Sequence, residues 1–250
     1  MPDLSLNYKK RLRELKTPYG AVLFCPGSPG SGSILYDKSL YANNGVITGA
    51  TWERSPSGLW GNSFDGDDSI SFGNSDNLKT LNSMSCLVWT KTLGTNSVMV
   101  IIGHYDSGAN KRKWMIYNGG NTPPQSTYLV VALSDDGTSN AGTFKRYLTN
   151  FAVYDGSWKL VGFTFDAPTS TLSLYVNGVL VTDLTKATNG AITSLYQSPT
   201  TNVTMGANYN SGVLASFQTG INKLLLITPT VLTAGWISNW YQQTRKFFNV

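Results

Sequence analysis

Carboxylates that could act as a catalytic pair are scarce in this chain. Its 250 residues include only two glutamates, Glu14 and Glu53. A glycoside hydrolase needs two carboxyl groups facing one sugar bond, about 5 Å apart for retention and further apart for inversion. No E-x-D-x-x-E pattern surrounds either glutamate, and Asp135-Asp136 is followed by Gly137, which is typical of a turn. We therefore expect no glycosidase activity and no enzyme.

Other catalytic and metal-binding residues are equally few. His104 is the single histidine, and no G-x-S-x-G sequence places a serine nucleophile for it. One histidine and two cysteines, Cys25 and Cys86, are too few for a four-ligand zinc site. We expect His104 to be structural or exposed. Cys25 and Cys86 are expected to be reduced and buried in strands, although a disulfide between them stays open.

Aromatic side chains remain as groups that could hold a ligand, because their faces stack on the apolar side of a sugar ring. Trp60, Trp114 and Tyr209 lie near expected loops and are the candidate stacking residues. Packing inside the domain is the alternative for these three. It is the main expectation for the other large rings at Trp52, Phe64, Trp89, Trp158 and Tyr175.

Short strands separated by turns must position these residues. Residues 171–176 alternate apolar and polar side chains, and Asn177-Gly178 follows, which favours a type I′ hairpin turn with positive φ at both positions. A strand, tight turn and strand are expected over 61–72. Further strands are expected at 19–25, 84–91, 97–104, 113–117, 127–133, 143–148, 160–165, 179–183, 202–206 and 214–227. A short helix is expected at 232–241, with Thr233 as its N-cap.

Charge divides the chain into a neutral body and two basic ends. Residues 1–16 have a net charge of +3 with helical spacing over 4–15, and residues 243–250 add +2. We expect a basic amphipathic leader at 1–18, one sandwich domain at 19–242, and a basic, aromatic tail at 243–250. The leader either docks on a partner or an acidic surface, or it frays.

The same charge and hydropathy pattern argues against several partners. A neutral body provides no basic groove for nucleic acid. Residues 1–16 lack the apolar run of a secretory signal peptide. No apolar run is long enough for a membrane-spanning helix.

Five short motifs follow one another in a characteristic order. They are D-x-S-x(3)-N-N-G-x-I-x-G-A-T-W at 37–52, G-x-S-F-D-G-x-D at 61–68, W-x-x-V at 158–161, L-x-L-Y-V-N-G at 172–178 and G-I-N-K at 220–223. The set resembles the laminin-G-like, concanavalin A-like lectin/glucanase superfamily, in the three-element form common in bacterial and phage proteins. The resemblance covers residues 19–242. It implies a jelly-roll β-sandwich of two antiparallel sheets, a concave face, and rim loops that often bind sugars or calcium.

The resemblance also implies a calcium site, since Asp37, Asn43 and Asn44 match the family's ligand positions. Calcium binds carboxylate, amide and carbonyl oxygens. The acidic pair expected before the last strand is replaced by Asn222 and Lys223. Either calcium is bound, or the Lys223 ammonium takes its place by pairing with Asp37. The aspartates at 65, 67 and 68 are expected to form a turn rather than to bind metal.

These observations favour a non-enzymatic structural or adhesion protein. We expect a virion subunit, such as a phage capsid decoration or fibre-type protein, assembled in the cytoplasm. Its concanavalin A-like domain would bind glycan or protein. Residues 1–17 and the Phe247-Phe248 tail would contact other virion proteins or further copies of the chain. A free-standing carbohydrate-binding lectin module is the alternative, and a glycoside hydrolase is the third option.

Overall fold

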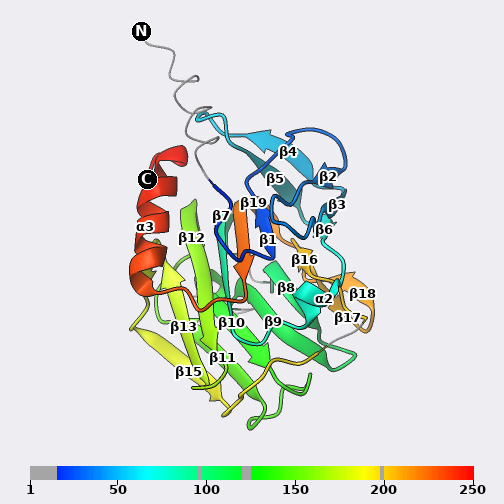
Figure 1. Ribbon diagram of the computed structural model, residues 1–250, viewed down its shortest axis with the longest axis vertical. Helices are drawn as coiled ribbons and strands as arrows, with labels where there is room; N and C mark the ends of the chain where they lie inside the picture. The colour runs from blue at the N-terminus through cyan, green and yellow to red at the C-terminus, as the bar shows by residue number, and fades with distance from the viewer. Residues whose placement is uncertain (1–15, 95–96, 120–124, 198–199) are drawn as a thin grey trace.

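The computed structural model describes residues 16–94, 97–119, 125–197 and 200–250. In these residues two antiparallel sheets pack face to face around an apolar core (Figure 1), which confirms the predicted all-β jelly-roll sandwich. The predicted leader helix over 4–15 lies outside the described residues. Among the described residues, no helix is long and apolar enough to cross a membrane.

Sheet A has the strand order β14-β13-β12-β7-β19-β5-β4, with β1 paired to β19. Its strands are β1 (Leu23–Cys25), β4 (Thr51–Arg54), β5 (Trp60–Asp65), β7 (Met84–Leu93), β12 (Asp155–Asp166), β13 (Thr171–Val176), β14 (Val179–Leu180) and β19 (Thr219–Thr228). A bulge interrupts β19, where the register shifts between Lys223 and Leu226 and Leu224 has a φ of 48°. The bulge lets β19 pair with β5 before it and with β1 after it.

Sheet B has the order β15-β11-β10-β9-β8-β16-β6-β3-β2, with the β17–β18 hairpin beside β8. Its strands are β2 (Ile34–Leu35), β3 (Gly45–Thr48), β6 (Ser69–Ser71), β8 (Val100–Asp106), β9 (Lys111–Asn118), β10 (Leu129–Ser134), β11 (Phe144–Thr149), β15 (Leu184–Asn189), β16 (Thr204–Met205), β17 (Asn208–Asn210) and β18 (Val213–Ala215). The predicted strand–turn–strand over 61–72 is present as β5 and β6. These two strands belong to different sheets, so the turn between them carries the chain across the sandwich.

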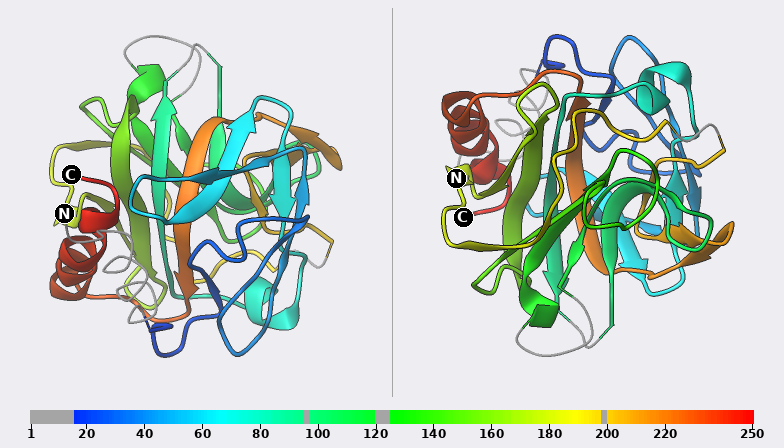
Figure 2. Two further views of the ribbon diagram at one scale, coloured as in Figure 1. Left: turned by 90° about the horizontal axis from the view of Figure 1, so that it is seen from above. Right: turned by 90° about the horizontal axis from the view of Figure 1, so that it is seen from below.

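A helical layer covers the outer face of sheet A. It consists of α3 (Ala234–Thr244) and the 3₁₀ turn η2 (Arg245–Phe247), and it lies beside β12 and β13 (Figures 1 and 2). The Oγ1 of Thr233 accepts a hydrogen bond from the amide of Trp236 at 3.2 Å, which confirms the N-cap. The described residues also form the short helix α2 (Asp76–Lys79) and the 3₁₀ turn η1 (Gln125–Thr127).

The hairpin turn and the cysteines agree with the sequence. Asn177 and Gly178 have φ angles of 51° and 79°, which confirms the turn with two positive φ values. A Cβ at Gly178 would lie 2.7 Å from the Cβ of Tyr241, so the turn passes directly beneath α3. Cys25 and Cys86 are free and buried, as expected for reduced cysteines.

The C-terminal tail belongs to the folded domain. Phe247 and Phe248 are both buried, and the Phe248 ring stacks on Trp89 with 4.1 Å between centroids. The Oγ of Ser57 donates a hydrogen bond to the carbonyl of Phe247 at 2.6 Å. The prediction that these two phenylalanines serve as external attachment points is therefore wrong, because the outer face of sheet A binds them.

Candidate ligand-binding groove

One face of α3 borders a hollow in the surface. Trp236, Asn239, Trp240 and Gln243 line it, and their i, i+3, i+4, i+7 spacing places them on one side of the helix. Residues 16–18 form the opposite wall, and the hollow has a volume of about 290 Å³. We call this hollow, with these seven lining residues, the α3 groove.

The aromatic wall of the α3 groove is supported from the interior. Trp240 is buried and meets Phe24 edge-to-face, with 6.0 Å between ring centroids and 70° between ring planes. Trp236 stacks on Trp240 at 5.4 Å with 13° between planes, and it remains half-buried. Offset stacking of this kind stabilises the ring pair and fixes its orientation. Trp236 therefore supplies indole surface to the groove from a rigid base.

A turn holds the opposite wall in place. The amide of Ala21 donates to the carbonyl of Pro18 at 3.1 Å, and Gly20 has a φ of 77°. This geometry is that of a type II turn, which needs a residue able to adopt positive φ at its third position. The Oγ1 of Thr17 donates to the carbonyl of Lys38 at 2.9 Å, so the wall is tied to the neighbouring loop as well.

The chemistry of the α3 groove matches a polyhydroxylated ring. An indole face packs on the C–H side of a sugar, and the carboxamides of Asn239 and Gln243 each offer donors and an acceptor for hydroxyl groups. Both carboxamides are exposed, and Lys16 is the one charged side chain among the described lining residues. The volume lies at the lower end of the range for small-molecule sites, about 300–1,000 Å³.

A second polar group lies on the outer face of sheet B, over the apolar cluster that includes Tyr105 and Tyr117. The Nε of Arg146 donates to the hydroxyl of Tyr117 at 2.7 Å, and the Arg112 guanidinium lies 5.9 Å from the Tyr105 ring centroid. Both tyrosines are only 7% exposed, and burial raises the pKa of each phenol. This face is thus filled by its own side chains and offers guanidinium edges rather than an open aromatic platform.

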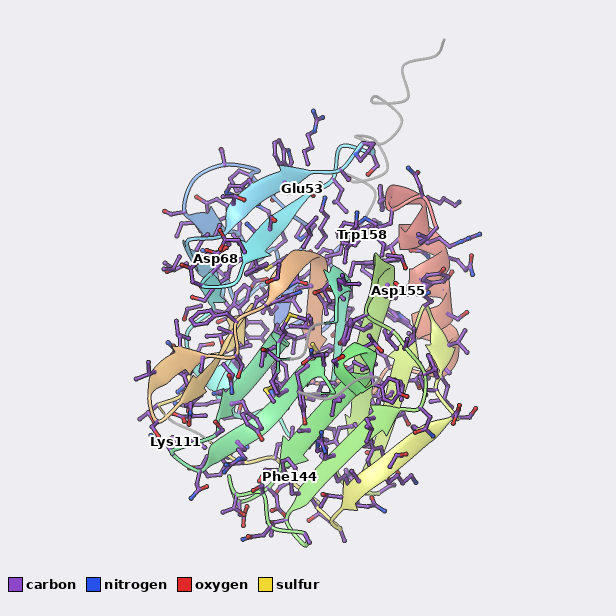
Figure 3. The ribbon with its side chains drawn as sticks, turned by 180° about the vertical axis from the view of Figure 1, so that it is seen from behind. Glu53, Asp68, Lys111, Phe144, Asp155 and Trp158 are labelled. Carbon is purple, nitrogen blue, oxygen red and sulfur yellow. The ribbon has the colours of Figure 1, made fainter. Side chains whose placement is uncertain are left out.

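Glu53 is held in an ion pair on the outer face of sheet A. The Nζ of Lys223 lies 2.5 Å from the Oε2 of Glu53 and 5.3 Å from the Trp158 ring centroid, and Figure 3 shows Glu53 and Trp158 at the same end of the molecule. Gly61 pairs with Glu53 in the sheet, and a Cβ at Gly61 would lie 2.2 Å from the Cγ of Lys223. The lysine stem therefore passes over Gly61 to reach Glu53. The predicted pairing of Lys223 with Asp37 is wrong.

Two basic side chains are buried inside the sandwich. His104 and Lys113 are both fully buried, and the Nζ of Lys113 donates to the carbonyl of Lys79 at the end of α2. Burial, aided by the Lys113 charge, lowers the pKa of His104 to about 3. Burial also lowers the pKa of Lys113 to about 7. The imidazole Nε2 is 2.5 Å from the carbonyl of Thr201, which assigns His104 a structural role.

Comparison with known proteins identifies the family. A family model described as the concanavalin A-like lectin/glucanases superfamily, of the laminin G type, matches residues 64–238. The chain belongs to this superfamily. No curated protein matched the chain.

Solved structures of the superfamily fold include toxin receptor-binding domains. The botulinum neurotoxin type G receptor-binding domain matches 89% of this chain and 51% of its own, with a TM-score of 0.58 and 16% identity. The receptor-binding domain of the botulinum neurotoxin C/D mosaic serotype matches 90% of this chain and 51% of its own, with a TM-score of 0.63 and 14% identity. The binding domain of botulinum neurotoxin DC in complex with rat synaptotagmin II matches 89% of this chain and 51% of its own, with a TM-score of 0.60 and 18% identity. The chain thus spans about half the length of these domains, and at such identity the likeness concerns the fold alone.

The calcium site implied by the superfamily resemblance can be tested on Asp37, Asn43 and Asn44. The Oδ1 of Asp37 accepts from the amides of Phe24 and Ser39, both at 2.8 Å, and its Oδ2 accepts from the amide of Asn43 at 2.8 Å and the Oγ of Ser39 at 2.6 Å. The Oδ1 of Asn44 accepts from the amide of Asp37 at 3.0 Å. These oxygens already satisfy donors of the protein, so the set braces the loop and does not fit a calcium ion.

Three aspartates at the β5–β6 turn form an acidic group. Carboxylate oxygens of Asp65, Asp67 and Asp68 lie within 4.8 Å of one another. The Oδ2 of Asp68 accepts from the amide of Asp65 at 2.9 Å, and Gly66 has a φ of 121°. Burial raises the pKa of Asp68. The hydrogen bond and the glycine support the predicted turn-forming role.

The structure does not bring the three predicted stacking residues together. Trp114 is completely buried in the core against Phe163, so its proposed role as a stacking surface is wrong. Trp60 is half-buried on β5 of sheet A with the Arg54 guanidinium 5.7 Å from its ring centroid. Tyr209 is half-buried on β17 of sheet B. Neither of these two lines the α3 groove.

Sequence reasoning placed a helix at 232–241 but assigned no site to it. The signal was present in the spacing W-x-x-N-W-x-x-Q over 236–243, which sets two indoles and two carboxamides on one helical face. Tryptophans at helical spacing are usually core residues. One of these two, Trp240, is indeed buried, and only the structure shows that Trp236 remains accessible beside residues 16–18.

Proposed function

We propose that this chain is a non-enzymatic recognition domain that binds a glycan in the α3 groove. The observation that carries the proposal is the stacked Trp236–Trp240 pair beside two exposed carboxamides in one hollow. Stacking rings with planar amides are the groups that recognise the two chemically different sides of a sugar. Two related solved domains support the class of function: one is described in complex with SialylT and one with rat synaptotagmin II.

The carboxylate inventory supports a binding role over hydrolysis. Of the two glutamates, Glu53 is paired with Lys223, and Glu14 lies outside the described residues. The Glu53 carboxylate is occupied by the Lys223 ammonium at 2.5 Å, and no second glutamate lies within the described residues to form a catalytic pair with it. We therefore infer that a bound glycan is released unchanged.

A glycan array followed by affinity measurement tests the groove. Trp236→Ala is expected to lower the affinity for the best-binding glycan by about tenfold, because the substitution removes the stacking surface. Gln243→Ala is expected to lower the affinity for the same glycan by about threefold to tenfold, because one hydrogen bond to the glycan is lost. The matched control is Gln242→Ala, an exposed glutamine of the same helix that does not line the groove. Equal binding by wild type and Trp236→Ala would place the ligand elsewhere.

The finer proposal is that this domain is a subunit of a virus particle, a capsid decoration or fibre-type protein that assembles in the cytoplasm. It rests on the basic residues 1–16 next to a neutral body, and on the occurrence of the resembled family form in phage proteins. A free-standing lectin is the alternative, and both use the same groove.

Light scattering after size-exclusion chromatography separates the two proposals. The full chain and a chain lacking residues 1–17 are compared, because the attachment proposal assigns assembly to those residues. A virion subunit is expected to form defined oligomers, or to bind particles, only in the full-length form. If both the full chain and the shortened chain are monomers that bind no particles, the lectin is favoured.

A further inference from the structure

Large apolar side chains protrude from the domain beside the α3 groove. Tyr19 and Leu40 are fully exposed, and Tyr41 is 53% exposed. They surround a shallow hollow of about 430 Å³ whose lining also includes Lys38 and residues 17–21. We call Tyr19, Leu40, Tyr41 and Lys38 the Leu40 patch. A single exposed leucine is ordinary, but three protruding apolar groups around one hollow form a patch that calls for an explanation.

The loop that carries Leu40 is braced from inside, so its protrusion is built into the fold. The Asp37 carboxylate accepts four hydrogen bonds from Phe24, Ser39 and Asn43, as described above. The Nδ2 of Asn43 donates to the carbonyl of Val22 at 2.7 Å. These bonds tie the loop to β1 and fix the backbone on both sides of Leu40. Tyr19 is fixed in the same way, since it lies in the type II turn closed by Pro18 and Ala21.

Charge around the patch has one sign within the described part of the chain. The charged residue lining the hollow of the Leu40 patch is Lys38, and that of the adjoining α3 groove is Lys16. Both lysines are exposed, and of the residues that the structure describes, no carboxylate lines either hollow. Asp37 is close in sequence, but its side chain is buried and its oxygens are taken.

We propose that the Leu40 patch docks the domain on a lipid surface with anionic headgroups. Leu40 enters the acyl boundary, and the two tyrosines take the interfacial position that suits a ring with a polar hydroxyl. Lys38 and Lys16 reach the headgroup phosphates and carboxylates with their flexible stems. Apolar side chains that protrude from rigid loops can insert into a fluid lipid layer. The positive charge of the two lysines complements an anionic surface.

Vesicle co-sedimentation of the full chain tests the proposal. The protein is expected to bind vesicles of phosphatidylcholine that contain phosphatidylserine, and to bind pure phosphatidylcholine more weakly. Tyr19→Ser with Leu40→Ser is expected to reduce partitioning about tenfold or more, because the transferred apolar area is lost. Lys16→Gln with Lys38→Gln is expected to weaken the preference for phosphatidylserine and its salt dependence, to which the basic residues 9–13 of the full chain also contribute.

Two controls make the outcome decisive. Val213→Ser replaces an apolar residue that is 69% exposed on β18 and should leave vesicle binding unchanged. Trp236→Ala should also leave it unchanged, which separates this proposal from glycan binding in the α3 groove. No binding to either vesicle overturns the proposal, as does binding that survives the Tyr19→Ser, Leu40→Ser change. A protein ligand lost in that variant, without vesicle binding, would likewise overturn it in favour of a protein partner.

Discussion

Replacing Phe248 with alanine is expected to lower the free energy of unfolding by about 3–5 kcal/mol, the usual cost of removing a buried phenylalanine. Phe248 is buried on the outer face of sheet A, where its ring stacks on Trp89 at 4.1 Å and lies 4.8 Å from Trp158. Its loss would expose the Trp89 ring and leave a cavity beneath η2. Urea unfolding followed by tryptophan fluorescence measures the change.

The control for this prediction is Phe151→Ala. Phe151 is 40% exposed, so its truncation is expected to cost less than about 1 kcal/mol. Phe248→Leu should recover part of the loss, since it refills the volume without the stacking. If Phe248→Ala and Phe151→Ala proved equally mild, residues 245–250 would not be part of the cooperative unit. The domain would then end at α3.

The burial of Phe247 and Phe248 could not be predicted from the local sequence. The pair follows Arg245 and Lys246, which are typical of a solvated end. Burial arises because α3 docks across sheet A and η2 turns the chain back over Trp89. Neither event has a local signature, since each depends on the apolar outer face of a sheet assembled from distant strands.

Strands and turns were predictable because their causes are local. The alternation over 171–176 and the Asn177-Gly178 turn each act within a few residues, and both are present as predicted. The ordered motifs led to the superfamily for the same reason, because each marks a turn or a strand end. Sheet membership was not predictable: β5 and β6 follow one another closely yet lie in different sheets.

The candidate site residues likewise depend on contacts that local sequence patterns do not encode. Trp114 lies at the start of the expected strand 113–117, next to polar residues 111–113, and this position near a loop made it a candidate stacking residue. A bulge opposite His104 and Tyr105 turns both Lys113 and Trp114 away from solvent. The α3 groove needs residues 16–18 against residues 236–243, a contact between opposite ends of the chain that no local pattern encodes.

The buried ammonium of Lys113 is expected to make the domain more stable as the pH rises. Its pKa is about 7 in the folded protein and near the ordinary 10.5 when unfolded, because burial penalises the charge. Between these values the unfolded chain binds a proton that the folded chain does not, so the free energy of unfolding increases with pH. Lys113 alone should contribute a rise of about 2–3 kcal/mol between pH 7 and pH 9.5, and the buried thiols of Cys25 and Cys86 offset part of it. Chemical unfolding at several pH values measures it.

Lys113→Met isolates this contribution. Methionine keeps much of the length without the charge, so the variant should be more stable than wild type at pH 7 by about 1–3 kcal/mol. Its stability should also vary less with pH. The residual slope is the balance of Lys223 and Lys145, whose pKa values burial lowers, against Cys25 and Cys86, whose pKa values burial raises. Lys111→Met on the same strand is the matched control and should keep the wild-type slope, because the Lys111 amine reaches the exposed Oγ1 of Thr200 rather than the core. An unchanged slope in Lys113→Met would mean that this lysine finds solvent and that the bulge in β9 opens to admit water.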